Sequence, residues 1–323
     1  MSGFKGSFTV MVTPFTEDGK GIDVAALKRL VDWQIEQGVP GLIPLGSTGE
    51  FLSVADDERT QVVETIVRQA RERVPVIVGT AAEWTDVAVR HSKEAEKLGA
   101  SGVMVVPPFY SSPTEDELFE HYRRIAEAIS IPVMIYNNPF TANVDLKPAL
   151  IARMSEIDNI RYVKESSGDI VRVREIRYLS KGRITVFAGY HPYDSMLLGA
   201  EGWVSVCGNI VPRLSADMYN ITVTKGDHKE GLAHFYRLVP ILDAISGDLY
   251  VSATKAAMAE VGMPVGQPRP PRLALPADRV AGLRRALAGL DWAPRRGRLR
   301  TTRQGKSQST LEEKLDDQHQ AVP

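Results

Sequence analysis

The sequence predicts an α/β fold, a (β/α)8 TIM barrel with an added C-terminal layer of helices. Eight short runs rich in Val and Ile alternate with longer amphipathic stretches, which is the order of elements in such a barrel. The runs are almost continuously apolar, as parallel strands are when both of their faces are buried. An open doubly wound sheet is the alternative, but no G-x-G-x-x-G turn follows the first run.

The predicted strands and helices alternate along the chain. The strands are expected to begin at Ser7, Gly41, Val74, Gly102, Ile131, Ile160, Arg183 and Gly202. Helical periodicity predicts helices over 24–37, 85–98, 115–129, 146–154 and 170–179, and one more that carries Val62, Val63, Ile66 and Val67. We expect the first helix to bury Leu27, Leu30, Val31 and Ile35. The spacing of Ser53 and Asp56 predicts a capping box at the start of the helix that carries Val62.

The chain stays helical after the eighth strand, with patterns over 214–224, 230–245, 251–260 and 278–290. One of these helices would complete the barrel, and the others would form the appended layer. From Arg295 the sequence is polar, charged and poor in apolar residues, which predicts a mostly disordered tail with a short helix around 310–317. The predicted organisation is a barrel core over 1–210, an eighth helix and helical layer over 211–294, and a tail over 295–323.

Nothing in the composition favours nucleic acid or an anionic membrane as a partner. The formal net charge of the 323 residues is −1, so no global charge attracts a polyanion. The single cysteine, Cys207, excludes a disulfide within the chain and fits a reducing cytoplasm; we expect Cys207 and Trp203 to be buried. The N-terminus lacks the features of a secretory signal, and no apolar stretch reaches the length of a membrane span, so a cytoplasmic location is expected.

Candidate reactive residues lie where the predicted strands end, which is where TIM-barrel enzymes carry their active sites. Side chains alternate along a strand, so Tyr162, Lys164 and Ser166 share one face, expected to be the lumen. Burial there disfavours the charged form of a lysine, and a neutral amine can attack a ketone carbon. The alternative is a strand-end lysine that reaches water or pairs with Glu165.

Two further strand ends carry groups that suit such an amine. Tyr136 lies one strand away, and a phenol beside a Schiff base can move protons; the alternative is a core tyrosine with a satisfied hydroxyl. The turn over 46–49 offers the hydroxyls of Ser47 and Thr48 and the backbone N–H groups around Gly49, which together can receive a carboxylate. The alternative for this turn is an ordinary loop, since Gly, Ser and Thr are common there.

Four motifs follow one another at the predicted strand ends, GSTGE, PPFYSSP, YNNP and VKESSGD, and the first strand carries VTPF. Together they resemble the N-acetylneuraminate lyase and dihydrodipicolinate synthase family over residues 4–292. The resemblance implies class I aldolase chemistry on a 2-oxo acid, without metal or organic cofactor. It implies that Lys164 forms the Schiff base, that Tyr136 is the general acid/base, and that Ser47 and Thr48 hold the substrate carboxylate.

The same resemblance implies an oligomer and a wider pocket. Tyr110 matches a tyrosine that enters the neighbouring subunit's site and completes a proton relay with Ser47 and Tyr136. A homo-oligomer, a tetramer built as a dimer of dimers, is therefore expected. Gly189 and Val204 match backbone positions near the substrate, and Gly49, Ser166 and His191 are candidate pocket residues.

Two departures from the family's motifs bear on the substrate. Dihydrodipicolinate synthases carry an arginine for a second carboxylate where this chain has Thr141, and a threonine cannot make the same bidentate pair. Sialic acid lyases carry acidic residues where this chain has His191 and Pro192. We therefore expect a Schiff-base lyase that cleaves, condenses or dehydrates another 2-oxo acid, such as a 2-keto-3-deoxy sugar acid.

Three alternatives stay open. Dihydrodipicolinate synthase itself, named more fully 4-hydroxy-tetrahydrodipicolinate synthase, is the first. A barrel that binds a 2-oxo acid without turnover is the second, although a pure binder has no need of the amine. A metal-dependent aldolase is the third, but of the six histidines only His191 lies at a predicted strand end, so we expect no metal site.

Overall fold

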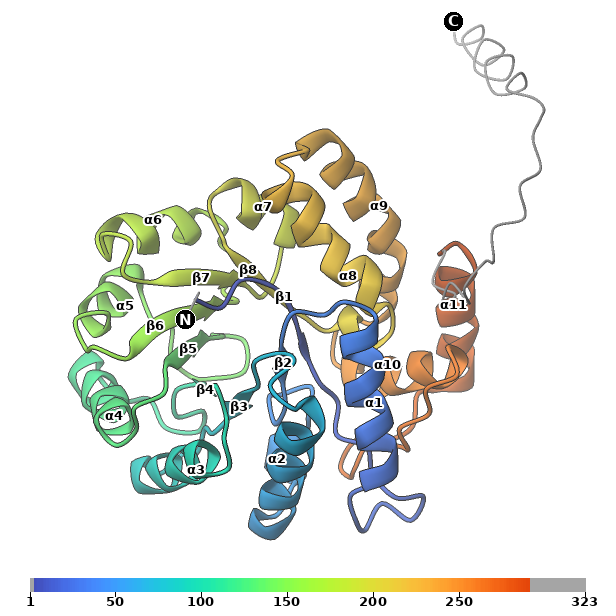
Figure 1. The fold of residues 1–323 in the computed structure, drawn as a ribbon, viewed down its shortest axis with the longest axis horizontal. Helices are drawn as coiled ribbons and strands as arrows, with labels where there is room; N and C mark the ends of the chain where they lie inside the picture. Colours follow the sequence, from blue (N-terminus) through green and yellow to red (C-terminus); the bar gives the residue numbers. More distant parts are fainter. Residues whose placement is uncertain (1–2, 291–323) are drawn as a thin grey trace, which may run out of the picture. The chain divides into compact units, whose positions relative to one another are not determined.

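The computed structural model describes residues 3–290, which form the predicted TIM barrel. Eight parallel strands follow the order β2-β1-β8-β7-β6-β5-β4-β3, and a parallel bridge between Leu42 and Val76 joins the two ends of this order. Figure 1 shows the strands at the centre with helices arranged around them. The fold class predicted from the alternating apolar runs is therefore confirmed.

The strands are short and buried. They are β1 (Gly6–Val10), β2 (Leu42–Ile43), β3 (Ile77–Gly79), β4 (Gly102–Val105), β5 (Val133–Asn137), β6 (Ile160–Glu165), β7 (Thr185–Ala188) and β8 (Gly202–Ser205). Almost every residue in them is buried, which explains why alternation of polar and apolar residues is missing from the sequence. Trp203 and Cys207 are buried as predicted.

Aromatic rings pack together inside the barrel below the strand ends. The Phe8 and Phe187 rings meet edge to face at 5.3 Å between centroids, and the Phe4 ring stacks on Tyr162 at 4.8 Å. The Tyr162 hydroxyl accepts a hydrogen bond from the backbone N–H of Phe4, 3.0 Å away. These rings pack around Tyr162, two residues before Lys164 on β6.

The helices between the strands match the predicted periodicity. They are α1 (Val24–Glu36), α2 (Asp56–Ala70), α3 (Thr85–Lys97), α4 (Glu115–Glu127), α5 (Pro148–Met154), α6 (Val171–Leu179) and α7 (Pro192–Leu197). Leu27, Leu30 and Val31 are buried on α1, but Ile35 is only half-buried and Gln34 is buried instead. The Gln34 side chain accepts from Thr9 Oγ1 at 2.8 Å and donates to the Gly208 carbonyl at 2.8 Å, so its polar atoms are satisfied in the core.

The predicted capping box at Ser53 and Asp56 is wrong. Ser53 belongs to a 3-10 turn, η1 (Phe51–Ser53), and α2 begins one residue after Ala55. The Ala55 side chain has no acceptor, and the Glu58 carboxylate instead accepts from the Ala55 backbone N–H at 3.0 Å. The N-cap is therefore Ala55, two residues after the predicted Ser53, because the 3-10 turn occupies Ser53. The spacing of side chains alone does not reveal this turn.

The C-terminal part of the described chain is helical as predicted. A 3-10 turn η2 (Cys207–Asn209) precedes α8 (Pro212–Tyr219), the π-helical turn η3 (Asn220–Thr224), α9 (His228–Ala244), α10 (Tyr250–Glu260) and α11 (Ala277–Ala288). α8 packs on β1 and β8, α9 packs on α8, and α11 packs on both α9 and α10 (Figure 1). The division at residue 210 stays a prediction, and the predicted tail over 295–323 lies outside the described residues. Within 3–290, no helix has the length and apolar character needed to cross a membrane.

Candidate active site

Lys164 is a buried amine beside an aromatic ring. It is 7% exposed on β6, and its Nζ lies 3.7 Å from the centroid of the Tyr136 ring. Lys164 and Tyr136 are register partners on β6 and β5, so their side chains emerge on the same side of the sheet. The predicted juxtaposition of these two residues is therefore present, and Lys164 does not reach bulk water.

The alternative pairing of Lys164 with Glu165 is not present. Glu165 faces the other side of β6, where its carboxylate accepts from Asn137 Nδ2 at 3.1 Å and from the Ser167 backbone N–H at 2.7 Å. Burial raises the pKa of Glu165 above its ordinary value, although these hydrogen bonds oppose the shift. Lys164 consequently has no carboxylate partner among the contacts of the described residues.

The Tyr136 phenol joins Lys164 to the turn after β2. Its oxygen accepts a hydrogen bond from Asn138 Nδ2 at 2.8 Å and interacts with Ser47. Burial alone would raise the pKa of Tyr136, but the positive charge of protonated Lys164 and the hydrogen bonds from Lys164, Asn138 and Ser47 lower it below the ordinary value. A phenol that loses its proton more readily is suited to accept and return protons near neutral pH.

The turn over 44–50 is held in a specific backbone shape. Leu45 and Glu50 have left-handed φ values of 57° and 54°, which residues with a Cβ adopt rarely. A Cβ at Gly79 of β3 would lie 2.0 Å from the Leu45 carbonyl oxygen, so glycine is needed for the strand to approach the turn. The Gly49 carbonyl accepts from Thr13 Oγ1 at 2.7 Å. Ser47 is half-buried and Thr48 buried, with Thr48 beside the Tyr250 side chain.

A small hollow lies next to this turn. It is lined by Ser47 and Tyr136 together with apolar residues of the second, third and fourth βα units. The apolar lining is formed by Leu45, Phe51, Ala81, Met104 and Val106, with Gly46 and Gly79. A hollow with mostly apolar walls and two convergent hydroxyls is typical of a site for a small polar molecule.

Ser166 and Gly189 meet beside Lys164 at the ends of β6 and β7. Ser166 is buried, and its hydroxyl has no hydrogen-bond partner within the described residues. A Cβ at Gly189 would lie 1.7 Å from Ser166 Oγ, so the glycine leaves the space that this hydroxyl occupies. Val204, the other backbone position expected near the substrate, lies within β8 opposite Phe8, and its side chain is buried in the core.

Thr141 and His191 lie at the rim rather than in the buried part of the site. Both are exposed, and Thr141 turns its N–H and hydroxyl toward the Asn138 carbonyl at 3.1 and 3.5 Å. His191 caps α7 with φ 48°, and Pro192 is the first residue of that helix. Beside them, the exposed rings of Phe140 and Tyr190 meet edge to face at 6.2 Å. The rim near Thr141 thus carries two exposed aromatic rings.

Tyr110 lies outside the buried part of the site. Its side chain is 85% exposed, while its loop is fixed by Glu83, whose carboxylate accepts from the backbone N–H groups of Phe109, Tyr110 and Ser111 at 2.8 to 3.0 Å. Burial raises the pKa of Glu83, but these hydrogen bonds and one from the Ser111 hydroxyl outweigh burial and hold the pKa at about 2. The Asn143 side chain donates to the Tyr110 carbonyl at 2.6 Å, which links this loop to the Thr141 loop.

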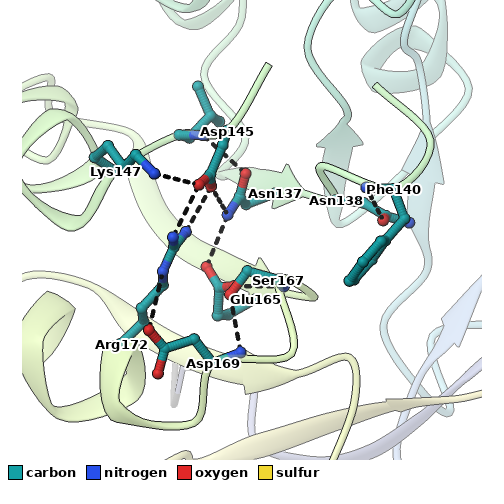
Figure 2. Close-up of polar contacts among 10 residues, drawn as sticks. Asn137, Asn138, Phe140, Asp145, Lys147, Glu165, Ser167, Asp169 and Arg172 are labelled. Carbon is teal, nitrogen blue, oxygen red and sulfur yellow. Dashed lines mark hydrogen bonds and ion pairs between the residues drawn. The ribbon is translucent and has the colours of Figure 1, made fainter. Parts of the chain in front are cut away.

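A polar network around Asn137 and Asp145 holds the loop that follows β5 (Figure 2). Asn137 Nδ2 donates to both Glu165 and Asp145, and its side-chain oxygen accepts from the Leu146 N–H at 2.9 Å. Arg172 forms two hydrogen bonds to Asp145 at 2.5 and 2.8 Å and holds the pKa of that carboxyl far below its ordinary value. The network fixes the ends of the 138–146 loop, and with them the position of Thr141.

Sequence patterns missed several of these residues. Asn138, Glu83 and Tyr190 follow predicted strands, so their position at strand ends was the available signal. Tyr250 begins α10 in the C-terminal layer, and no local pattern points from it to Thr48. Within residues 3–290, no three His, Cys, Asp or Glu side chains gather in the manner of metal ligands.

Comparisons with known proteins match almost all of the described chain. The sequence model described as "Dihydrodipicolinate synthetase family" matches residues 3–289. The 4-hydroxy-tetrahydrodipicolinate synthase of Acidiphilium cryptum is 37% identical over 289 residues, which cover 89% of this chain and 98% of the relative.

Two solved structures share the fold at similar identity. A putative dihydrodipicolinate synthetase from Pseudomonas aeruginosa is 39% identical with a TM-score of 0.85, over 89% of this chain and 99% of that one. The chloride-inhibited dihydrodipicolinate synthase from Acinetobacter baumannii, solved with pyruvate, is 33% identical with a TM-score of 0.86, over 89% and 99% of the two chains.

Proposed function

The chain belongs to the dihydrodipicolinate synthetase family, a family of class I aldolase-type lyases, and we propose that Lys164 is its Schiff-base residue for pyruvate or a related 2-oxo acid. The observation that carries this proposal is the placement of the buried Lys164 amine 3.7 Å from the Tyr136 ring centre. Tyr136 in turn interacts with Ser47, so amine, phenol and hydroxyl-bearing turn are contiguous. The pyruvate bound in the Acinetobacter baumannii relative supports the same class of ligand.

The proposed chemistry uses each of these groups once. The substrate carboxylate binds at Ser47 and Thr48, where hydroxyls and backbone N–H groups converge. The neutral Lys164 amine attacks the C2 ketone to form a carbinolamine, and Tyr136 transfers protons as water leaves and the protonated imine forms. The imine then accepts the electron pair released at C3, either from a C–H bond before condensation with an aldehyde or from the C3–C4 bond in cleavage. In a dehydration, the C3 proton is lost first and the C4 hydroxyl leaves.

Trapping with borohydride tests the proposal directly. Reduction of the pyruvate imine should add the mass of a 1-carboxyethyl group to one peptide, the peptide that contains Lys164. The Lys164→Ala variant should gain no mass under the same conditions. An unmodified wild-type protein after incubation with a range of 2-oxo acids would instead favour the alternative of a barrel that binds without turnover.

The names of the relatives bear on the second reactant. They favour 4-hydroxy-tetrahydrodipicolinate synthesis, the alternative expected from the sequence, over the cleavage or dehydration of a sugar acid. We therefore propose synthesis as the first reaction to test. A dipicolinate has two carboxylates, so a synthase must accommodate one more carboxylate than pyruvate brings.

One observation keeps the sugar-acid reaction as a second candidate. The rim position where an arginine was expected for synthesis holds the exposed Thr141, flanked by the uncharged rings of Phe140 and Tyr190. Thr141 and these two rings carry no positive charge, which suits a neutral, hydroxylated substrate chain. Assays of pyruvate release and of dehydration with 2-keto-3-deoxy sugar acids, run beside a synthase assay with pyruvate and an amino-acid aldehyde, separate the two candidates by their relative kcat/KM.

We also propose that the enzyme is a homo-oligomer, a tetramer built as a dimer of dimers. Tyr110 is exposed, and so are Leu52 and Trp84 in the loops after β2 and β3 on the same side of the barrel. Exposed apolar side chains grouped at one rim are typical of a protein–protein interface. Light scattering should give a mass above that of one chain, and Tyr110→Phe should lower kcat if this residue completes a partner's proton relay.

A further inference from the structure

One charged pair outside the residues already assigned a role is completely enclosed. Lys255 Nζ on α10 lies 2.8 Å from Glu50 Oε1, and the two side chains are 1% and 0% exposed. Glu50 ends the turn that carries Ser47 and Thr48, and its N–H donates to the Ser47 carbonyl at 3.1 Å. The pair therefore joins the C-terminal layer to the base of the proposed carboxylate site.

The surroundings of the pair connect the same two regions. Lys255 Nζ also donates to the Gln267 carbonyl at 3.1 Å and lies 4.2 Å from the centre of the Phe15 ring. Glu50 Oε2 accepts from the Arg269 backbone N–H at 2.9 Å. The Arg269 guanidinium binds Glu58 through two hydrogen bonds of 2.5 and 2.6 Å. The segment from the turn to the start of α2 is thus held at both ends by the chain after α10.

The position of this pair is not explained by stability alone. Removing two charges from water is unfavourable, and apolar residues of similar volume often stabilise a core as well as a buried ion pair does. What the pair does supply is a fixed orientation of Glu50. This residue has φ 54°, a conformation that residues with a Cβ adopt rarely and that persists only where the surroundings enforce it. A second contact from the same helix reaches the turn, since Tyr250 at the start of α10 interacts with Thr48.

We propose that Lys255 is a positioning residue, which fixes Glu50 and thereby holds Ser47 and Thr48 in the geometry that receives the carboxylate of a 2-oxo acid. The inference rests on the proposed function of the turn. Lys255 touches no reacting atom; it acts through Glu50. The C-terminal layer is in this view part of the substrate site and does not serve only to cover the barrel.

Three variants and one control test the proposal. Lys255→Met keeps the length of the side chain and removes its charge, Glu50→Gln keeps an acceptor on the turn, and the double variant replaces the ion pair by a neutral pair. Arg284→Met is the control, because it breaks the exposed ion pair with Glu260 that joins α11 to the end of α10. Each protein is incubated with increasing pyruvate and then reduced with borohydride, and the mass of the Lys164 peptide is measured beside thermal unfolding.

We expect the three variants to need about tenfold more pyruvate for half-maximal trapping, the scale of one lost charged hydrogen bond, and to reach the wild-type amount of adduct at saturation. Arg284→Met should trap like the wild type. The double variant should recover thermal stability relative to Lys255→Met and still bind pyruvate weakly, which separates positioning from folding. If Lys255→Met does not fold, Glu50→Gln and the double variant decide the question.

Two results would overturn the inference. One is that Glu50→Gln and the double variant need the same pyruvate concentration as the wild type for half-maximal trapping. The other is a defect that disappears well below each variant's melting temperature, since the pair would then only hold the fold. Failure of the wild type to form any adduct at Lys164 would be a different result, because it would refute the proposed function itself.

Discussion

The Lys164 amine and the Tyr136 ring face each other across adjacent strands, with 3.7 Å between Nζ and the ring centroid. The β5–β6 register sets this relationship, since Tyr136 and Lys164 are direct partners in it. The phenol oxygen beyond the ring then reaches Asn138 and Ser47. A substrate that fills the space between amine and turn would have its ketone beside Lys164 and its carboxylate beside Ser47, so the first two predictions concern these groups.

Lys164→Ala should abolish turnover and borohydride trapping. No other lysine of the proposed site can replace it, because Lys255 is enclosed by Glu50 and Gln267. The measurement is the rate of product formation together with the mass of the trapped protein. Arg161→Ala is the matched control, since Arg161 is exposed on the same strand and should leave both unchanged. Near-normal turnover in Lys164→Ala would refute the assignment of the Schiff base.

Tyr136→Phe should lower kcat by ~10²–10⁴-fold, the range usual for the loss of a positioned acid/base. The ring that packs over Lys164 is retained, so we expect the protein to fold normally and KM to change less than kcat. Single-turnover kinetics of imine formation provide the check. A variant with the wild-type rate would assign the proton transfers to another group, such as a bound water.

The sequence predicted the parts of the site that depend on local pattern. Alternation along β6 placed Tyr162 and Lys164 on one face, and apolar runs predicted the barrel that brings strand ends together. It did not predict contacts between distant elements, such as Tyr250 with Thr48 or Lys255 with Glu50, because these depend on how α10 packs against the turn. Gln34 is buried on α1 in place of the expected Ile35, and this also depends on contacts between distant elements. Gln34 is buried only because Thr9 and Gly208 satisfy its amide.

Glu83 should make the Tyr110 loop sensitive to acid. Its pKa in the folded protein is about 2, below the ordinary 4.5, so its contribution to stability is present above pH 4.5 and is lost as the pH falls toward 2. Glu83→Gln should remove this contribution. We expect the wild type to unfold at higher urea than the variant at pH 6 and the two curves to converge as the pH approaches 2. A difference that is constant over this range would contradict the prediction.

Gly189→Ala should destabilise the protein and disturb the Lys164 site. The new Cβ would lie 1.7 Å from Ser166 Oγ and 2.9 Å from the Glu165 carbonyl oxygen, so the two residues that follow Lys164 on the chain would have to move. Overpacking of this kind costs about 1–3 kcal/mol of unfolding free energy. Urea unfolding measures it, with Gly21→Ala as control because a Cβ there meets nothing closer than 3.7 Å. Equal loss in the two variants would contradict the steric explanation.

Thr141→Arg should reveal whether the rim selects against a second carboxylate. The residue is exposed, and its loop is anchored at its far end by Asp145 and Arg172, so a longer side chain can be accommodated without rearranging the core. A guanidinium at this position can form a bidentate pair with a carboxylate, which threonine cannot. We expect Thr141→Arg to lower the KM for an aldehyde that carries a carboxylate by about tenfold, the scale of one charged hydrogen bond, and to leave pyruvate trapping unchanged.

Thr141→Gln, which adds length without charge, should have no such effect. If the wild type already uses a carboxylate-bearing aldehyde efficiently and Thr141→Arg adds nothing, another group at the rim binds that carboxylate, and the uncharged Thr141 does not argue for a sugar acid.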